Sequence, residues 1–117
     1  MSAEAQREFV KRFYDALDAG DADTASALFA DGTRIYLWDG REFRTRAEFR
    51  AWFERLRSRS DAAKRHVTSF KVEGNVAQVV VVLKANFRGK EHVVELLHEF
   101  VFEGDRLVEV HVEIRPR

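Results

Sequence analysis

The chain has 117 residues, 45% of them hydrophobic and 12% aromatic, which suits a single domain over residues 1–117 with a substantial core. Twenty basic residues balance twenty acidic ones, so charge gives no reason to expect nucleic acid or an anionic membrane as partner. Cysteine is absent, which excludes disulfides and thiolate chemistry. With no targeting signal and no long apolar run, we expect a cytoplasmic protein. Its charged surface favours a monomer, with a sheet-to-sheet dimer through Val80, Val82, Leu97 and Val101 as the alternative.

Two helices are predicted at the start of the chain. Residues 3–19 carry apolar side chains at helical spacing, with Ser2 placed to cap the first turn and Gly20 placed beyond the last. Asp21 can cap a second, short helix that runs to Phe29.

Two polar residues of the first helix are harder to place. Tyr14 lies at the edge of the apolar stripe, so its phenol could point inward or span core and surface. Asp18 falls on the polar face by its helical angle, which predicts a solvated carboxylate.

A hairpin and a third helix follow. Residues 34–38 and 41–44 predict two strands joined by a tight Asp-Gly turn. Thr45 and Glu48 have the spacing of a capping box. The helix after them carries large apolar residues at helical spacing: Phe49, Trp52, Phe53 and Leu56.

After a polar loop at 58–62, glycine-containing turns separate the remaining strands. We expect these strands at residues 64–73, 76–88, 90–103 and 106–115. The order α-α-β-β-α-β-β-β-β indicates an α+β fold, in which a curved antiparallel six-stranded sheet wraps around the helices and encloses a cone-shaped cavity.

His98 is the most informative residue of these strands. Side chains alternate along residues 92–103, so the glutamates at 95, 99 and 103 mark the solvent side and His98 shares the apolar side. An imidazole there needs a polar partner. It is either a satisfied core histidine or the working part of a pocket.

Arg65 begins a strand whose later residues, Phe70 and Val72, imply a conflicting register. A bulge could turn Arg65 inward, although the pattern alone favours a surface arginine. We find no residues at metal-ligand spacing and predict no metal site.

The element order and the segments FYDALDAGD (13–21) and Trp38-Asp39-Gly40 resemble the nuclear-transport-factor-2-like (NTF2-like) superfamily. Its members include ketosteroid isomerases, polyketide cyclases, epoxide hydrolases and binding-only domains, so the fold alone decides little. The chain resembles more closely, along its whole length, the de novo designed luciferases of the LuxSit type. The runs FYDALDAGDADTASALF, LWDG and EFRAWFERL carry this resemblance.

The second resemblance implies two catalytic pairs, Tyr14 with His98 and Asp18 with Arg65. Ser60 departs from the arginine of the parent design, which leaves Arg65 as the single cation over the substrate. The implied substrate slot comprises Leu37, Trp38, Phe49, Trp52, Phe53, Leu56, Val81, Leu83, Val94, Leu96, Phe100, Val110 and Val112. The two tryptophans could also simply fill core, and members of the group differ at Leu96 and Val110.

The implied reaction is oxidation of a luciferin, a synthetic imidazopyrazinone related to coelenterazine such as diphenylterazine, with emission of light. Molecular oxygen is the co-substrate and no cofactor is needed. Arg65 would stabilise the substrate anion with Asp18 holding its guanidinium. His98 would accept or polarise a proton, oriented by Tyr14.

Two other functions stay open. An isomerase or cyclase of the same fold would need a carboxylate deep in the cone, for which Asp18 is the only candidate. A binding module would bind a small molecule without turnover.

Overall fold

The protein is described by a computed structural model over residues 1–30, 32–60 and 62–115. One residue of the predicted loop at 58–62 and the last two of the predicted domain lie outside the described residues. No helix of the described part is long and apolar enough to cross a membrane.

The helices begin directly after the capping residues that the sequence predicts. They are α1 (Ala3–Ala19), α2 (Ala22–Ala27) and α3 (Arg46–Ser58). The Ser2 hydroxyl accepts from the amide of Ala5 at 3.0 Å, and Gly20 ends α1 with φ 71°, a left-handed conformation that glycine adopts without strain. In the capping box, the Thr45 hydroxyl accepts from the amide of Glu48 at 3.1 Å. The second helix is shorter than its predicted run to Phe29.

The strands form one sheet in the order β2-β1-β6-β5-β4-β3. They are β1 (Arg34–Tyr36), β2 (Glu42–Phe43), β3 (Ala62–Glu73), β4 (Val76–Phe87), β5 (Lys90–Glu103) and β6 (Arg106–Arg115). This arrangement confirms the predicted α+β fold. One pairing differs from the expected antiparallel sheet, because β1 runs parallel to β6 with Ile35 opposite Val110. No tight turn joins these two strands, so nothing local determines their relative direction.

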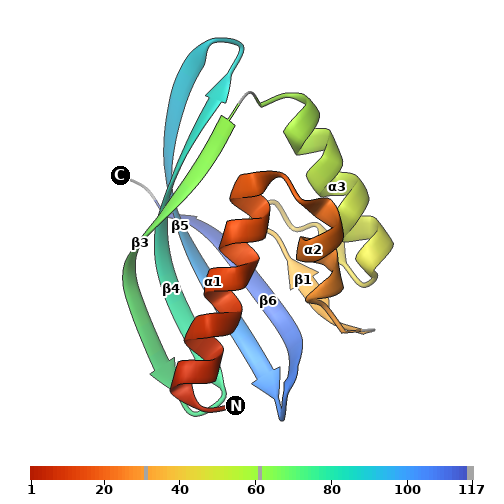
Figure 1. Ribbon diagram of the computed structural model, residues 1–117, viewed down its shortest axis with the longest axis vertical. Helices are drawn as coiled ribbons and strands as arrows, with labels where there is room; N and C mark the ends of the chain where they lie inside the picture. Colours follow the sequence, from red (N-terminus) through yellow and green to blue (C-terminus); the bar gives the residue numbers. More distant parts are fainter. Residues whose placement is uncertain (31, 61, 116–117) are drawn as a thin grey trace.

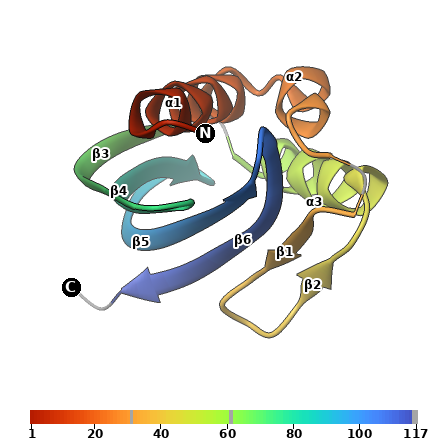
Figure 2. The ribbon, with the colours of Figure 1, turned by 90° about the horizontal axis from the view of Figure 1, so that it is seen from below.

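The helices lie on the concave side of the sheet (Figures 1 and 2). Seen from below, β3 curls toward α1 at one edge of the sheet. The core forms between these layers from aromatic side chains, such as Phe13 and Phe29, whose rings meet edge to face at 5.4 Å. The curvature therefore brings residues of α1 opposite residues of the long strands.

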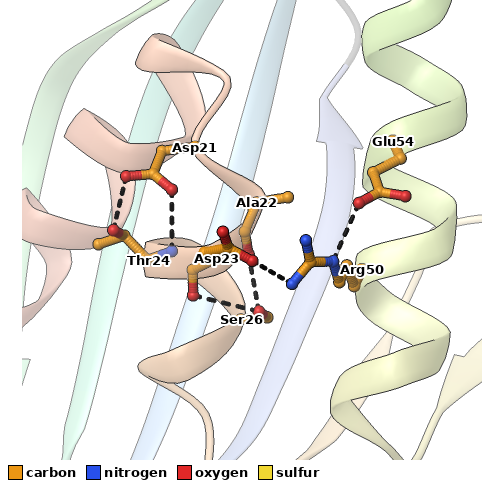
Figure 3. A network of polar contacts seen from close by, with 7 residues as sticks. All are labelled: Asp21, Ala22, Asp23, Thr24, Ser26, Arg50 and Glu54. Carbon is orange, nitrogen blue, oxygen red and sulfur yellow. Dashed lines mark hydrogen bonds and ion pairs between the residues drawn. The ribbon is translucent and has the colours of Figure 1, made fainter.

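Exposed polar contacts cap α2 and link it to α3 (Figure 3). Asp21 accepts from the amide of Thr24 at 3.0 Å and so caps α2. Arg50 of α3 forms ion pairs with Asp23 and, at 2.9 Å, with Glu54. Such exposed pairs contribute little stability, so apolar packing is what holds these helices in place.

A β-bulge in β3 decides which of its side chains face the core. The register with β4 shifts between Val67 and Ser69, which leaves Thr68 without an opposite residue. The hydroxyl of Thr68 donates to the carbonyl of Val80 at 3.2 Å. The side chain thus supplies one hydrogen bond to β4 where the regular pairing is interrupted.

The bulge explains the conflicting registers of β3. Arg65, before it, lies opposite Leu83, whereas Phe70, after it, lies opposite Val79. Leu83 and Val79 share the inward face of β4, so both ends of β3 direct side chains inward. The expectation of a surface arginine is therefore wrong, and the bulged alternative is confirmed.

Candidate functional site

A cavity of about 300 Å³ lies between the helices and the concave face of the sheet. This volume is at the lower end of the range typical of small-molecule sites, roughly 300–1,000 Å³. Its wall is mainly aromatic and aliphatic, with contributions from α1, α3 and five strands. The few polar side chains on the wall are Arg57, Ser60, Arg65 and His98.

Most of the predicted substrate contacts line this cavity. They are Leu37, Trp38, Phe49, Trp52, Phe53, Leu56, Leu83, Val94, Leu96, Val110 and Val112. Trp38 is 46% exposed, which places it at the opening, whereas Trp52 is half-buried and also packs against the core.

Two predicted contacts, Val81 and Phe100, lie in the closed core and not on the cavity wall. Both are fully buried, and the ring of Phe100 packs against those of Phe13 and His98 at 6.0 and 5.9 Å. Strand alternation predicts the face on which a side chain lies but not how deeply neighbouring rings cover it. The structure therefore corrects the prediction that Val81 and Phe100 line the substrate slot.

Tyr14 and His98 form a buried hydrogen-bonded pair. The phenol oxygen lies 2.5 Å from Nδ1 of the imidazole. Tyr14 projects from α1 and His98 from the inward face of β5, and each is about 95% buried. His98 lines the cavity and Tyr14 lies behind it. The imidazole thus has the polar partner that its position on an apolar strand face requires.

Burial keeps both members of this pair uncharged. It lowers the pKa of His98 to about 3, with a smaller contribution in the same direction from the Arg65 cation. Burial also raises the pKa of Tyr14 far above its ordinary value. At neutral pH the pair is therefore a neutral phenol and a neutral imidazole.

The pairing also determines which ring nitrogen carries the proton. Among the described residues the Tyr14 hydroxyl has no acceptor other than Nδ1 of His98, and an unsatisfied buried O–H is costly. We infer that the phenol donates to Nδ1, which places the imidazole proton on Nε2. The imidazole then offers the cavity a hydrogen-bond donor.

Asp18 and Arg65 form the second pair. Arg65 donates from Nη1 to Oδ1 of Asp18 at 2.8 Å and from its main-chain amide to Oδ2 at 3.2 Å. The Arg65 side chain is 11% exposed, and its Nε is buried without a partner among the described residues. The carboxylate therefore holds the guanidinium at the cavity wall through a charge-assisted pair.

The prediction of a solvated Asp18 is wrong. Its side chain is only 24% exposed because the polar face of α1 meets the edge strand β3 at this point. Asp18 does not line the main cavity. It lies with Tyr14 and Arg65 on a second cavity, of about 230 Å³, between α1 and β3.

Sequence reasoning missed Arg57 as part of the cavity wall. It lies in the last turn of α3, four residues after Phe53, and is half-buried. The spacing from Phe53 was the available signal, because residues four apart share a helix face.

No acidic side chain of the described residues lines this cavity. The site can therefore hold a flat apolar molecule while offering cations and an N–H donor to negative charge.

Structural comparisons find the same fold in proteins of low sequence identity. PrhC from Penicillium brasilianum superposes with a TM-score of 0.87 at 16% identity, covering 97% of this chain and 83% of that one. An NTF2-like protein of unknown function from Burkholderia pseudomallei gives 0.86 at 18% identity, covering 98% and 92%. A LEH-like epoxide hydrolase from M. tuberculosis gives 0.79 at 14% identity, covering 92% and 80%. At these identities the likeness concerns the fold alone.

Comparison with curated proteins finds no significant match. A family model does match, over residues 10–110, and it describes a SnoaL-like domain. The match includes both catalytic pairs expected from the sequence and most of the cavity wall. The chain belongs to the SnoaL-like domain family and has its NTF2-like fold.

Proposed function

We propose that the chain is a luciferase that oxidises a synthetic imidazopyrazinone, such as diphenylterazine, with molecular oxygen and without a cofactor. One observation carries the proposal: the Tyr14–His98 and Asp18–Arg65 pairs each place one polar side chain on the wall of the same apolar cavity. The resemblance to the designed luciferases implies these same four residues. The apolar wall supports the proposal too, because water in the cavity would quench an excited product.

In the proposed reaction the luciferin first loses its ring N–H proton and becomes an anion. The anion transfers electrons to molecular oxygen and forms a carbon–oxygen bond to it. The resulting peroxide attacks the neighbouring carbonyl carbon and displaces the ring nitrogen bonded to it, which gives a dioxetanone and leaves the electron pair on that nitrogen. Cleavage of the O–O bond and of the carbon–carbon bond of the dioxetanone releases carbon dioxide and leaves an excited amide, which emits light. Arg65 stabilises the anion, since a guanidinium stays charged and Asp18 prevents its reorientation.

The proposed role of His98 follows from its protonation state. With a pKa of about 3 the imidazole is a weak proton acceptor at neutral pH. In this proposal Nε2–H instead donates to the carbonyl oxygen of the luciferin, which gains negative charge on deprotonation, and the proton passes to water. Tyr14 keeps the donating nitrogen toward the substrate.

The isomerase or cyclase alternative needs a carboxylate on the cavity wall. Asp18 is held by Arg65 and lies on the second cavity, and the described part of the chain puts no other acidic side chain on the main one. We therefore favour the luciferase. The remaining alternative, binding without turnover, is an outcome of the test below.

The test is photon counting after purified protein is mixed with diphenylterazine in air-saturated buffer, with albumin as control. We expect light far above the albumin background, and His98→Ala and Arg65→Ala should each remove most of it while the circular dichroism spectrum is unchanged. His66→Ala and Arg12→Ala, which change exposed residues of the same types, should stay bright.

Each other result has a definite meaning. Darkness combined with quenching of tryptophan fluorescence by the luciferin would replace the luciferase with a binding module. If His98→Ala and Arg65→Ala both stay bright, the site is wrongly assigned even though the activity stands.

A further inference from the structure

The cavity wall includes a second cation, which has no role in the reaction proposed above. Arg57 lines the cavity from the last turn of α3 and is half-buried. Unlike Arg65, its guanidinium has no hydrogen-bond or ion-pair partner among the described residues. A partly desolvated cation without a counter-ion favours the binding of an anion.

Gly20 provides the place in which this guanidinium lies. A Cβ atom at Gly20 would come within 2.6 Å of Cζ and Nε of Arg57, a separation that real Cβ atoms do not adopt. Only glycine therefore lets the guanidinium lie directly against the main chain here. Gly20 also caps the C-terminus of α1, whose last turn has no basic residue of its own. Arg57 thus lies at the negative end of that helix dipole, which favours a cation.

The balance of charge on the wall singles out Arg57. The wall includes two arginines and no acidic side chain of the described residues. Asp18 neutralises Arg65 from outside the cavity, so the unbalanced positive charge belongs to Arg57. We propose that the cavity selects flat aromatic molecules with a single negative charge, and that Arg57 contacts the charged group in addition to Arg65.

This inference rests on the proposed function where it names the luciferin anion as the natural occupant, because that anion is of this class. Selection of an aromatic anion can nevertheless be measured without turnover. A protein that gives no light but still selects aromatic anions would contradict the luciferase function and support this inference. A protein that gives light but does not select aromatic anions would support the luciferase function and contradict this inference.

A matched pair of fluorescent probes tests the proposal. 8-Anilinonaphthalene-1-sulfonate is a flat aromatic monoanion, and N-phenyl-1-naphthylamine is the same molecule without its sulfonate. Both tryptophans of the chain line the cavity, so energy transfer from tryptophan to probe reports binding there. The wild-type protein should bind the anionic probe more tightly than the neutral one.

Removing the charge of Arg57 should separate the two probes. We expect Arg57→Gln to weaken the anionic probe about tenfold, the size of one lost charge-assisted hydrogen bond, and to leave the neutral probe unchanged. Arg55→Gln is the matched control, because Arg55 belongs to the same last turn but is exposed and does not line the cavity.

Gly20→Ala tests the position of Arg57 without altering its charge. The new Cβ must displace the guanidinium, so affinity for the anionic probe should fall in the wild type and not fall further in Arg57→Gln. The proposal is overturned if the anionic probe does not bind, if Arg57→Gln leaves its affinity unchanged, or if both probes weaken equally.

Discussion

At the scale of single residues, His98 links the stability of the fold to pH. Its pKa is lowered to about 3, chiefly by burial, whereas an exposed histidine titrates near about 6.5. Between these values the unfolded chain binds one more proton than the folded chain. The free energy of unfolding therefore decreases as pH falls from about 6.5 toward 3, by up to about 1.4 kcal/mol per pH unit.

We predict that His98→Gln removes this contribution. Between about pH 7 and about pH 5, the wild type should lose more stability in urea unfolding than the variant does. The other histidines and the carboxylates are common to both proteins, so they cancel in the comparison. Parallel curves would mean that His98 titrates normally in the folded state.

Tyr14→Phe tests the protonation pattern of the pair. Without the phenol O–H, Nδ1 of His98 loses its hydrogen-bond donor 2.5 Å away. The hydrogen bond that favours the tautomer with the proton on Nε2 is then absent. We expect a stability loss of about 1–3 kcal/mol and a large fall in light output. The ¹⁵N shifts of the His98 ring should report Nε2–H in the wild type and a tautomer mixture in the variant. An Nδ1–H wild type would contradict the inferred donor.

At the scale of secondary-structure elements, the bulge in β3 lets Arg65 and Phe70 face the same side of the sheet although they are five residues apart. Deleting Thr68 would make the strand regular and keep Arg65 opposite Leu83 and Phe70 opposite Val79, so we expect this variant to fold and to stay bright. Deleting Ser69 as well would turn Arg65 and Phe70 to opposite sides, and we expect that double deletion to lower the melting temperature and to abolish light in photon counting. A bright double-deletion variant would show that the site does not depend on the inward orientation of Arg65.

Elements with local signals were predictable, and the long-range pairings were not. Caps at Ser2 and Thr45 and the glycine turns identify helices and hairpins because each signal lies within a few residues of its effect. Asp18 was misplaced because helical angle ignores which strand edge lies beside the helix. The parallel β1–β6 pair depends on contacts between distant parts of the chain. For the partnership of Asp18 with Arg65, only the family resemblance provided a signal.

At the scale of the whole molecule, the outer face of the sheet bears on oligomeric state. Its apolar residues Val80, Val82 and Leu97 are only partly covered, and Val93 is 40% exposed. Charged residues such as Glu99 interrupt this face, and contiguous apolar area rather than single exposed residues drives association. We predict a monomer in solution, measured as molar mass by light scattering during gel filtration. A dimer that Val82→Lys dissociates would instead identify this face as an interface.

The two hydrogen bonds that Arg65 donates to Asp18 have a consequence for the solubility of the protein. β3 is the last strand of the sheet and pairs only with β4, so its outward amides are open to strands of other molecules. One of these amides, that of Arg65, is occupied by Oδ2 of Asp18. The carboxylate that orients the guanidinium thus also blocks an edge at which copies of the chain could join and aggregate.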